Sequence, residues 1–436
     1  MHAPQPTKSA SSGWLSGQRV YVLSVLTLIY VLNMVDRKIL TIIQEPIKKE
    51  FALADWQLGL MTGFAFAAVY AVAGIPLARF ADHPTLKRVD IVAAALVVWS
   101  AATAACGVAQ NFTQMLLARL VVGVGEAGSG PPSQSLIADH FGRHERGRAM
   151  GVYALASPIG IAFGLSIGGV MADLFSWRTS LLLVGLPGVL LAILFRKTVP
   201  EPVRGQSEGR SGGVLEHPSF VSVVRTLLRK KTFLLLVSAG CFSAFGNLGV
   251  QYWFPSFFMR SYGMTLGQVG FVWGFASGLA GIVGTYAGGW LVDRFGKKSP
   301  RYILLVPAAG SAILLPFHIG AVLSAEWHIA LVLLLVPTTL ATLWVAPNMV
   351  LNQGLAPLAM RSTVVAISTF LVNMIGLGFG PVVLGYVSDL FTAAYGSSEV
   401  GLRYALIAMS PSYLIAGVLF FAGSFFVERD LEPVPT

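Results

Sequence analysis

Five charged side chains lie inside long apolar stretches of the sequence, where charge is costly. Asp36, Arg37 and Lys38 are consecutive in one stretch, and Arg119 and Glu126 share another. On membrane-insertion scales each such residue costs roughly 2.5–3.5 kcal/mol at the centre of a span, so each needs a reason to be there. Burial favours the protonated form of a carboxyl group, whereas a neighbouring guanidinium favours its ionised form. Asp36 and Glu126 are therefore the candidates for binding and releasing protons.

The two arginines indicate how these carboxylates are held. Arg119 and Glu126 lie about two helical turns apart on nearly the same face of a helix, too far apart to pair within it. We expect each to pair with the stretch that holds Asp36 and Arg37, and these two neighbours to have different partners. A guanidinium binds phosphate or carboxylate through two parallel hydrogen bonds. Arg119 is therefore the first candidate to bind an anionic head group, and Arg37 the second. Static structural ion pairs are the alternative.

The composition indicates which elements position these residues. Of the 436 residues, 55% are hydrophobic and 11% are charged, whereas soluble domains carry about 25% charged residues. No single soluble core could bury this much apolar surface, so a disordered chain, a coiled coil and an ordinary cytosolic enzyme are excluded. Twelve apolar stretches are long enough to span a membrane as helices. They lie near 20–43, 57–81, 89–109, 112–138, 147–175, 177–195, 232–259, 268–292, 301–323, 328–352, 363–391 and 402–427.

The basic residues between the spans set the expected orientation. With the N-terminus inside, most of the 30 Lys and Arg residues fall on the inner side, as the positive-inside rule requires. The net charge of +10 then reflects topology, and no nucleic-acid partner is expected. We expect a multi-pass protein of the plasma (inner) membrane with both termini cytoplasmic. Its expected segments are a cytoplasmic tail (1–19), six spans (20–196), a polar cytoplasmic linker (197–231), six further spans (232–428) and a second cytoplasmic tail (429–436).

The two halves of the chain resemble each other. The sequence IGIAFG at Ile159–Gly164 recurs as IGLGFG at Ile375–Gly380, and DLF at Asp173 recurs at Asp389, all at one offset close to half the chain. Two related six-helix halves are typical of transporters, with a substrate site between the halves near the middle of the membrane. The predicted fold is an all-α membrane protein of twelve transmembrane helices in two pseudo-symmetric six-helix bundles.

Two inner loops at corresponding positions combine an acidic residue with basic ones. The loop GWLVDRFGKK at Gly289–Lys298 resembles the signature loop of the major facilitator superfamily, which implies the fold of that superfamily. The loop at Ala78–Arg88 departs from it, with Ala78, His83 and Thr85 in place of Gly, Arg and Gly. An acidic residue at a helix end can cap helix amides and pair with nearby bases. Such contacts would hold two helices together in one state and release them in another. The gating candidates are Asp82, Lys87, Arg88, Asp293, Arg294 and Lys297.

Three stretches are similar to the spinster branch of that superfamily. They are LNMVDR at Leu32–Arg37, RLVVGVGEA at Arg119–Ala127 with the following IADHF at Ile137–Phe141, and YWFPSFF at Tyr252–Phe258. The branch usually has an aromatic residue where Met34 stands. Members of the branch are associated with lysolipid and sphingolipid transport, so the resemblance implies an amphipathic anionic lipid as substrate.

The second half of the chain would line a substrate site with residues of a different kind from the charged ones of the first half. Its polar and aromatic residues lie among many apolar ones, and the binding candidates are Asn247, Tyr252, Trp253 and Asn373. A charged wall facing a mostly apolar one suits a solute with an anionic head and a hydrocarbon tail. No ATP-binding loop is present, so a proton gradient is the expected energy source, with no cofactor and no metal. The expected partners are the lipid bilayer, protons and an amphipathic small molecule, and a monomer is expected.

Two other functions stay open. A proton-linked carrier of small organic acids or sugars would keep the fold but have polar residues on both walls. A membrane-embedded lipid hydrolase would use Ser166, which lies in GLSIG at Gly164–Gly168, the spacing of a nucleophile elbow. The internal repeat, the loop signature and the missing catalytic partners favour a transporter, and an enzyme is not expected.

Overall fold

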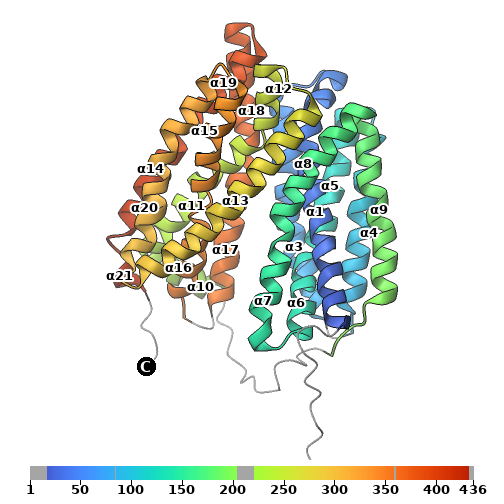
Figure 1. Ribbon diagram of the computed structural model, residues 1–436. Helices are drawn as coiled ribbons and strands as arrows, with labels where there is room; N and C mark the ends of the chain where they lie inside the picture. Colours follow the sequence, from blue (N-terminus) through green and yellow to red (C-terminus); the bar gives the residue numbers. More distant parts are fainter. Residues whose placement is uncertain (1–16, 84, 204–219, 358–359, 432–436) are drawn as a thin grey trace, which may run out of the picture.

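The computed structural model describes residues 17–83, 85–203, 220–357 and 360–431. All regular secondary structure within these ranges is helical. The helices form two bundles that lie side by side, one from each half of the chain (Figure 1). The predicted all-α fold of two six-helix halves is confirmed.

The first bundle consists of six long helical segments, which we call rods, and several of them are interrupted. The rods are α1 (Gly17–Phe51); α2 (Asp55–Gly59), η1 (Leu60–Phe64) and α3 (Ala65–Asp82); α4 (Arg88–Gly107); α5 (Phe112–Ala127) and α6 (Gly130–His140); α7 (Arg143–Ala154) and α8 (Ala156–Leu174); and α9 (Trp177–Thr198). The interruption between α5 and α6 follows directly after Glu126, where prolines begin the next helix, as proline does in the first turn of a helix.

The second bundle repeats this arrangement. Its rods are α11 (Lys231–Gln251) and α12 (Phe254–Tyr262); α13 (Leu266–Gly296); α14 (Arg301–Leu323); α15 (Trp327–Leu340) and α16 (Val345–Gly354); α17 (Arg361–Asn373), η3 (Met374–Phe379) and α18 (Gly380–Tyr395); and α19 (Ser398–Ala408) and α20 (Pro411–Gly423). Two short helices, α10 (Phe220–Arg229) and α21 (Val427–Asp430), lie outside the rods.

The rods correspond to the twelve expected spans. Within the described residues, 11 helical stretches are long and apolar enough to cross a membrane. The remaining rod is α5 with α6, which is interrupted and carries Arg119 and Glu126. Some boundaries differ from the expectation: α1 continues to Phe51 instead of ending near residue 43, because charged residues of its last turns, Glu45 and Lys48, bind partners of their own.

The linker between the halves was expected to be polar, and part of it is a helix. Residues 204–219 lie outside the described ranges, but α10 follows them. Val223 and Leu227 of α10 are 1% and 2% exposed and pack against the second bundle. Apolar residues four positions apart form one face of a helix, which explains why this basic segment folds onto the bundle.

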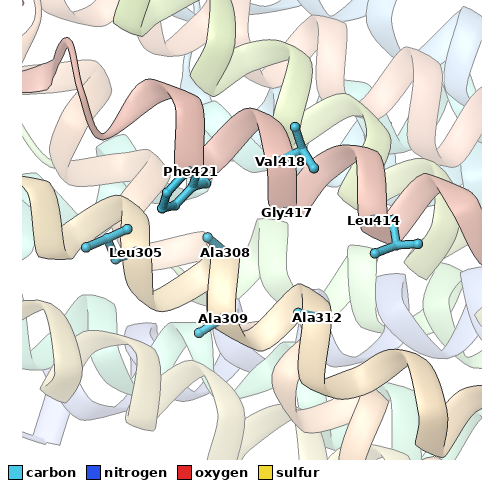
Figure 2. Close-up of a pocket in the computed structure, with 8 residues that line it drawn as sticks. All are labelled: Leu305, Ala308, Ala309, Ala312, Leu414, Gly417, Val418 and Phe421. Carbon is cyan, nitrogen blue, oxygen red and sulfur yellow. The ribbon is translucent and has the colours of Figure 1, made fainter.

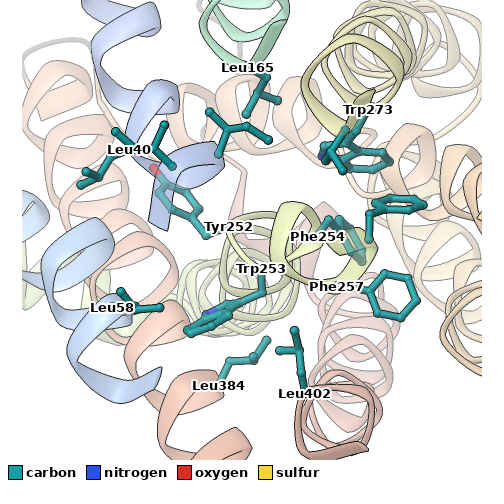
Figure 3. Packing of buried hydrophobic residues seen from close by; sticks show 14 of the residues in the cluster. Leu40, Leu58, Leu165, Tyr252, Trp253, Phe254, Phe257, Trp273, Leu384 and Leu402 are labelled. Atoms are coloured by element: carbon teal, nitrogen blue, oxygen red, sulfur yellow. The ribbon is translucent and has the colours of Figure 1, made fainter. Parts of the chain in front are cut away.

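The bundles are joined at one end and separate at the other. One buried cluster takes residues from both bundles, including Leu40 and Leu165 from the first and Trp253, Phe257 and Trp273 from the second (Figure 3). Two other clusters each belong to a single bundle. We call the shared cluster the plug. The joined end, where α12 and α19 lie at the top of Figure 1, is the closed end, and the opposite end is the open end.

Glycines bring α1 close to α8 at the depth of Asp36. Gly160 and Gly164 of α8 face Met34 and Val35 of α1, and a Cβ added to Gly160 would lie 2.4 Å from that of Met34. Small residues at four-residue spacing allow such close approach between membrane helices. The backbone of α1 is therefore held against α8 at the level of its charged residues.

The bundles contact each other mainly at two places where a helix of one packs against a helix of the other. We call these two contacts the seams. In one seam α8 packs against α13, and in the other α2 with η1 packs against α18. A Cβ on Gly270 of α13 would lie 2.3 Å from the carbonyl oxygen of Leu165, and one on Gly59 of α2 would lie 2.2 Å from that of Pro381. These contacts occupy equivalent places in the repeat, so the seams are related by pseudo-symmetry.

Candidate functional site

Asp36 and Arg119 form a buried pair inside the first bundle. Arg119 Nη1 lies 3.5 Å from Asp36 Oδ1, and each side chain is 2% exposed. The hydroxyl of Thr103 on α4 donates a hydrogen bond of 2.6 Å to Asp36 Oδ2. The pair therefore joins α1 and α5 away from their ends, and Thr103 links it to the last part of α4.

Arg37 and Glu126 form a second pair one residue further along α1. Arg37 Nε donates to Glu126 Oε2 at 2.5 Å. The guanidinium also lies over the rings of Phe66 and Tyr70, 4.6 and 4.9 Å from their centroids, which stabilises a cation in a site with little water. The prediction that the two neighbours on α1 have different partners on the other charged span is confirmed.

The hydrogen bonding of these pairs is incomplete. Within the described structure, four of their buried atoms make no hydrogen bond: Asp36 Oδ1, Glu126 Oε1, and Nε and Nη1 of Arg119. Buried polar groups in proteins are nearly always hydrogen-bonded. A buried ion pair stabilises a fold only when its remaining atoms also find partners. The four charges are therefore held together in an arrangement that leaves bonding capacity unused.

A polar cavity of about 100 Å³ lies beside the second pair. Arg37 and Glu126 line it together with Tyr30, Tyr70 and Tyr153, and the rings of Tyr30 and Tyr153 stack with their centroids 4.8 Å apart. A cavity of this size has room for a few water molecules but not for a hydrocarbon chain. Glu126 therefore borders a space through which a proton could reach it.

The four predicted binding residues of the second bundle do not gather around this cavity. Asn247 Oδ1 accepts a hydrogen bond of 2.9 Å from Gln251 Nε2 within α11. Trp253 Nε1 donates to the carbonyl oxygen of Pro381 at 3.1 Å inside the plug. Asn373 is exposed at the end of α17. Their binding roles stay predictions.

Tyr252 contacts the first bundle directly. The ammonium of Lys38 lies 4.3 Å from the centroid of the Tyr252 ring, so a cation on α1 reaches an aromatic side chain of the opposite bundle. Arg119 does not line the cavity, although the sequence favoured it over Arg37 for binding a head group. In this conformation Arg37 is the guanidinium that the cavity exposes.

A larger groove of about 430 Å³ lies elsewhere in the second bundle. Figure 2 shows it between α14 and α20. It is lined by Leu305, Ala308, Ala309, Ala312, Leu414, Gly417, Val418 and Phe421. It offers no charged or hydrogen-bonding side chain, and most of its lining residues are exposed on the outer face of the bundle, so it carries none of the chemistry considered above.

The predicted gating residues lie at the open end. The side chain of Asp82 lies outside the described residues, and Lys87, Asp293, Arg294 and Lys297 are exposed. Arg88 is 2% exposed and bonds within the first bundle, to Asp139 at 2.5 Å and Glu201 at 2.8 Å. Arg88 therefore joins the start of α4 to α6 and to the segment after α9. Its gating role, like that of the others, stays a prediction.

At the closed end, Arg260 of α12 binds carboxylates of the first bundle. Its guanidinium donates to Glu45 Oε1 at 2.7 and 2.9 Å and to both oxygens of Asp55 at 2.7 Å. Asp55 also pairs with Lys48 and accepts a hydrogen bond of 2.7 Å from Ser388 of α18. We call these five residues the Arg260 cluster. Burial alone would lower the pKa of Arg260, but the hydrogen bonds to Asp55 and the charge of Glu45 outweigh it and raise that pKa. The guanidinium therefore stays charged.

Two aspartates cap helices of the opposite bundle at the same end. Asp389 of α18 accepts hydrogen bonds of 2.9 Å from the backbone N–H groups of the first two residues of α2. Asp173 of α8 accepts hydrogen bonds of 3.2 and 2.7 Å from the first two residues of α13. A carboxylate is favourable there because helix N-termini carry unpaired N–H groups and partial positive charge.

Sequence reasoning assigned no role to the closed-end residues or to Lys38. The repeated DLF contained Asp173 and Asp389, and this repeat was the available signal for them. Arg260 directly follows the span expected at 232–259, and this position was the available signal for it. Their partners could not be read from the sequence, because each partner lies on the other bundle.

The comparisons with known proteins agree with this architecture. Residues 26–381 match the family described as Major Facilitator Superfamily. This chain belongs to the major facilitator superfamily. The facilitator chain is 31% identical over 411 residues to an MFS-type efflux pump of Mycolicibacterium smegmatis, with 93% of each chain covered. It is 26% identical to protein spinster homolog 1 of Bos taurus, covering 96% of this chain and 83% of that one. It is also 26% identical to a hexuronate transporter of Bacillus subtilis, covering 96% of both.

A solved structure indicates which branch of the superfamily the chain resembles. The facilitator superposes with a TM-score of 0.89 and 27% identity on the crystal structure of a bacterial homologue of the human lysosomal transporter spinster, in an inward-facing and unoccupied conformation. The match covers 96% of this chain and 99% of that one. The facilitator is a transporter of the spinster type and not an enzyme. The hydroxyl of Ser166, the residue considered for a hydrolase, donates to the carbonyl oxygen of Gly270 at 3.0 Å across a seam.

Proposed function

We propose that this facilitator is a proton-coupled secondary transporter that moves an amphipathic anion, such as a lysophospholipid or a sphingolipid-like molecule, by alternating access. The observation that carries the proposal is the Arg37–Glu126 pair, which lies inside the membrane-spanning part of the first bundle and borders a polar cavity. Ionisable residues at such positions usually mark a substrate or proton pathway.

Glu126 and Asp36 are the proposed proton carriers. A static structural pair would have its remaining atoms hydrogen-bonded, whereas one oxygen of each carboxylate here has no hydrogen-bond partner in the described structure. Protonation of Glu126 removes the charge that holds Arg37, so the guanidinium becomes free to bind an anion. Binding of a proton and of an anionic head group are then linked, and each favours the other.

The proposal of a lipid substrate rests on the similarity to spinster proteins. The chain is similar over nearly its whole length to proteins named spinster, and its charged residues are those of the stretches that resemble that branch. A guanidinium is suited to phosphate recognition because its paired N–H groups match two phosphate oxygens.

The closed end is proposed to face outwards. Basic residues gather at the open end, among them Arg146, Arg148, Lys297 and Lys298, and the positive-inside rule places such loops in the cytoplasm. The conformation is then inward-facing, like that of the related crystal structure. With this orientation both termini are cytoplasmic, in a plasma (inner) membrane protein that acts as a monomer.

Transport into proteoliposomes tests the proposal. Labelled lysophospholipid would be offered with and without a pH gradient, to the wild type and to the Glu126→Gln and Arg37→Gln variants. We expect gradient-dependent movement in the wild type and its loss in both variants, while Asp90→Asn, a change in an exposed acid, leaves it intact. Movement of the lysophospholipid at the same rate with and without the pH gradient would contradict proton coupling. No movement with folded protein would contradict the lipid substrate.

A carrier of small organic acids is the second candidate. The relative named hexuronate transporter favours it, and so does the size of the cavity, about 100 Å³, which suits a small anion better than a lipid tail. The same vesicles would be offered labelled glucuronate. Gradient-dependent uptake of glucuronate without movement of the lysophospholipid would establish this alternative in place of the first.

A further inference from the structure

Lys38 is a cation inside the membrane-spanning part of α1 with a contact that its neighbours lack. Its side chain is partly exposed, and its ammonium lies 4.3 Å from the centroid of the ring of Tyr252, the residue that follows α11 in the opposite bundle. The backbone of Lys38 is fixed by the close contact of α1 with α8, where a Cβ on Gly164 would lie 3.2 Å from that of Lys38. The ammonium is therefore presented at the boundary between the two bundles.

No carboxylate neutralises this ammonium. Among the described residues Lys38 forms no ion pair, and the two carboxylates of the charged group, Asp36 and Glu126, are already paired with Arg119 and Arg37. The five ionisable residues together hold three positive and two negative charges. One positive charge is left over at a depth where an unpaired ion is unfavourable.

The contact with Tyr252 stabilises this charge only in part. An aromatic face attracts an ammonium, but it carries no counter-charge, and it leaves the three N–H donors of the ammonium without strong acceptors. A lysine kept only for packing would be replaced at less cost by Met, which has a similar shape and no charge. The position therefore suits a group that receives its counter-charge from outside the chain.

We propose that Lys38 binds the anionic group of the transported molecule, and that Tyr252 holds its ammonium while that group is absent. The inference rests on the proposed transport of an amphipathic anion and names the residue that selects for its charge. While Asp36 and Glu126 are both ionised, one negative charge on the ligand neutralises the five-residue set, so an amphipath with a single negative charge is sufficient for binding at Lys38. Binding of the anion draws the ammonium away from Tyr252 and so removes a contact between α1 and a residue of the plug.

Binding of two lipids with the same tail tests the role of Lys38. The first probe is labelled oleoyl lysophosphatidylglycerol, which has one negative charge, and the second is monooleoylglycerol, which has none. Wild type, Lys38→Met and Lys38→Arg would be compared in detergent. We expect Lys38→Met to bind the anionic probe about tenfold more weakly or worse, since a hydrogen bond to a charged group is worth about that factor. Lys38→Arg should retain binding, and all three proteins should bind the neutral probe alike.

The outcomes separate this inference from the proposed function. If wild type binds the anionic lipid and Lys38→Met binds it equally well, the role of Lys38 is refuted while the transport of anionic lipids stands. If wild type binds neither lipid, the proposed function fails and the inference fails with it. If Lys38→Met loses both probes, the charge is not what was recognised, and the inference is refuted. Thermal unfolding of each variant shows that it is folded, and removal of an unpaired charge should not lower its midpoint.

Discussion

Asp173 and Asp389 make the same contact on opposite sides of the molecule. Each carboxylate accepts two backbone hydrogen bonds from the first turn of a helix in the other bundle, at the start of α13 for Asp173 and of α2 for Asp389. The two aspartates are equivalent in the internal repeat, and so are the helices that they cap. The internal repeat is therefore visible in the contacts between the bundles as well as in the fold of each bundle.

Replacing either aspartate should loosen the closed end. For Asp173→Ala or Asp389→Ala we expect a loss of about 0.5–2 kcal/mol from the closed conformation, the usual effect of removing a helix cap. The two effects should be similar in size and should add, because the sites are far apart and share no partner. Spin labels at Lys49 and Ser398, which are exposed on opposite bundles at this end, would report the change as longer distances.

The control for this measurement is Glu326→Ala, which changes an acid that is 65% exposed and contacts no helix of the first bundle in the described structure. Equal distance distributions for the cap variants and this control would refute the capping role.

Loss of Arg260 should have a larger effect than loss of either cap. The variant Arg260→Ala leaves Asp55 and Glu45 without their guanidinium partner, and removing one member of a buried pair costs about 3–5 kcal/mol. We expect a lower unfolding midpoint and a marked shift of the spin-label distances towards the separated state. The double variant Arg260→Ala with Asp55→Ala should lose less than the sum of the single variants, since the second change removes a carboxylate that has already lost its guanidinium partner. Strict additivity would show that the two side chains do not interact.

Adding one methyl group to Gly160 should push α1 away from α8. A Cβ there would lie 2.4 Å from the Cβ of Met34, and overpacking of this kind typically costs about 1–3 kcal/mol. Thermal unfolding of Gly160→Ala should show a lower midpoint, and transport should fall because Asp36 and Arg37 move with α1. The matched control is Gly151→Ala on α7, where no atom lies within 4 Å of the added Cβ, so stability should be unchanged or slightly higher. Identical midpoints for the two variants would contradict the close approach.

Ser166 should behave as a packing residue. Its hydroxyl donates to Gly270 across a seam, so Ser166→Ala should cost about 1 kcal/mol of stability and leave transport largely intact. A fluorophosphonate probe should not label the wild type. Labelling that disappears in Ser166→Ala would instead reveal a reactive serine.

The sequence was sufficient to predict the features that depend on local pattern. Span length and hydrophobicity predicted the twelve rods, because a lipid-exposed segment must be long, apolar and helical. The spacing of Arg119 and Glu126 placed them on one face of a helix, and this geometry was enough to predict that Asp36 and Arg37 find different partners on α5.

Features that depend on how the bundles dock could not be predicted. Arg260 meets Asp55 and Asp173 meets the start of α13 only because the bundles are joined at one end. Trp253 was assigned to substrate binding because aromatic residues line binding sites, but its indole N–H bonds to Pro381 within the plug. The buried face of α10 was missed because its charged residues made the linker polar on average, although the apolar residues repeat at helical spacing.

Among the described residues the other seam has no equivalent of the Arg260 cluster, since Leu266 occupies the place in the repeat that Asp55 holds. Attraction between opposite charges weakens slowly with distance, whereas contacts between apolar surfaces are lost within an ångström or so. As the bundles separate, the ion pairs near α2 still attract each other at distances where the apolar contacts between α8 and α13 are already lost. We therefore expect the closed end to separate more at α8 and α13 than near α2. Spin-label pairs placed across each side should then separate by unequal amounts, and equal separations would contradict this expectation.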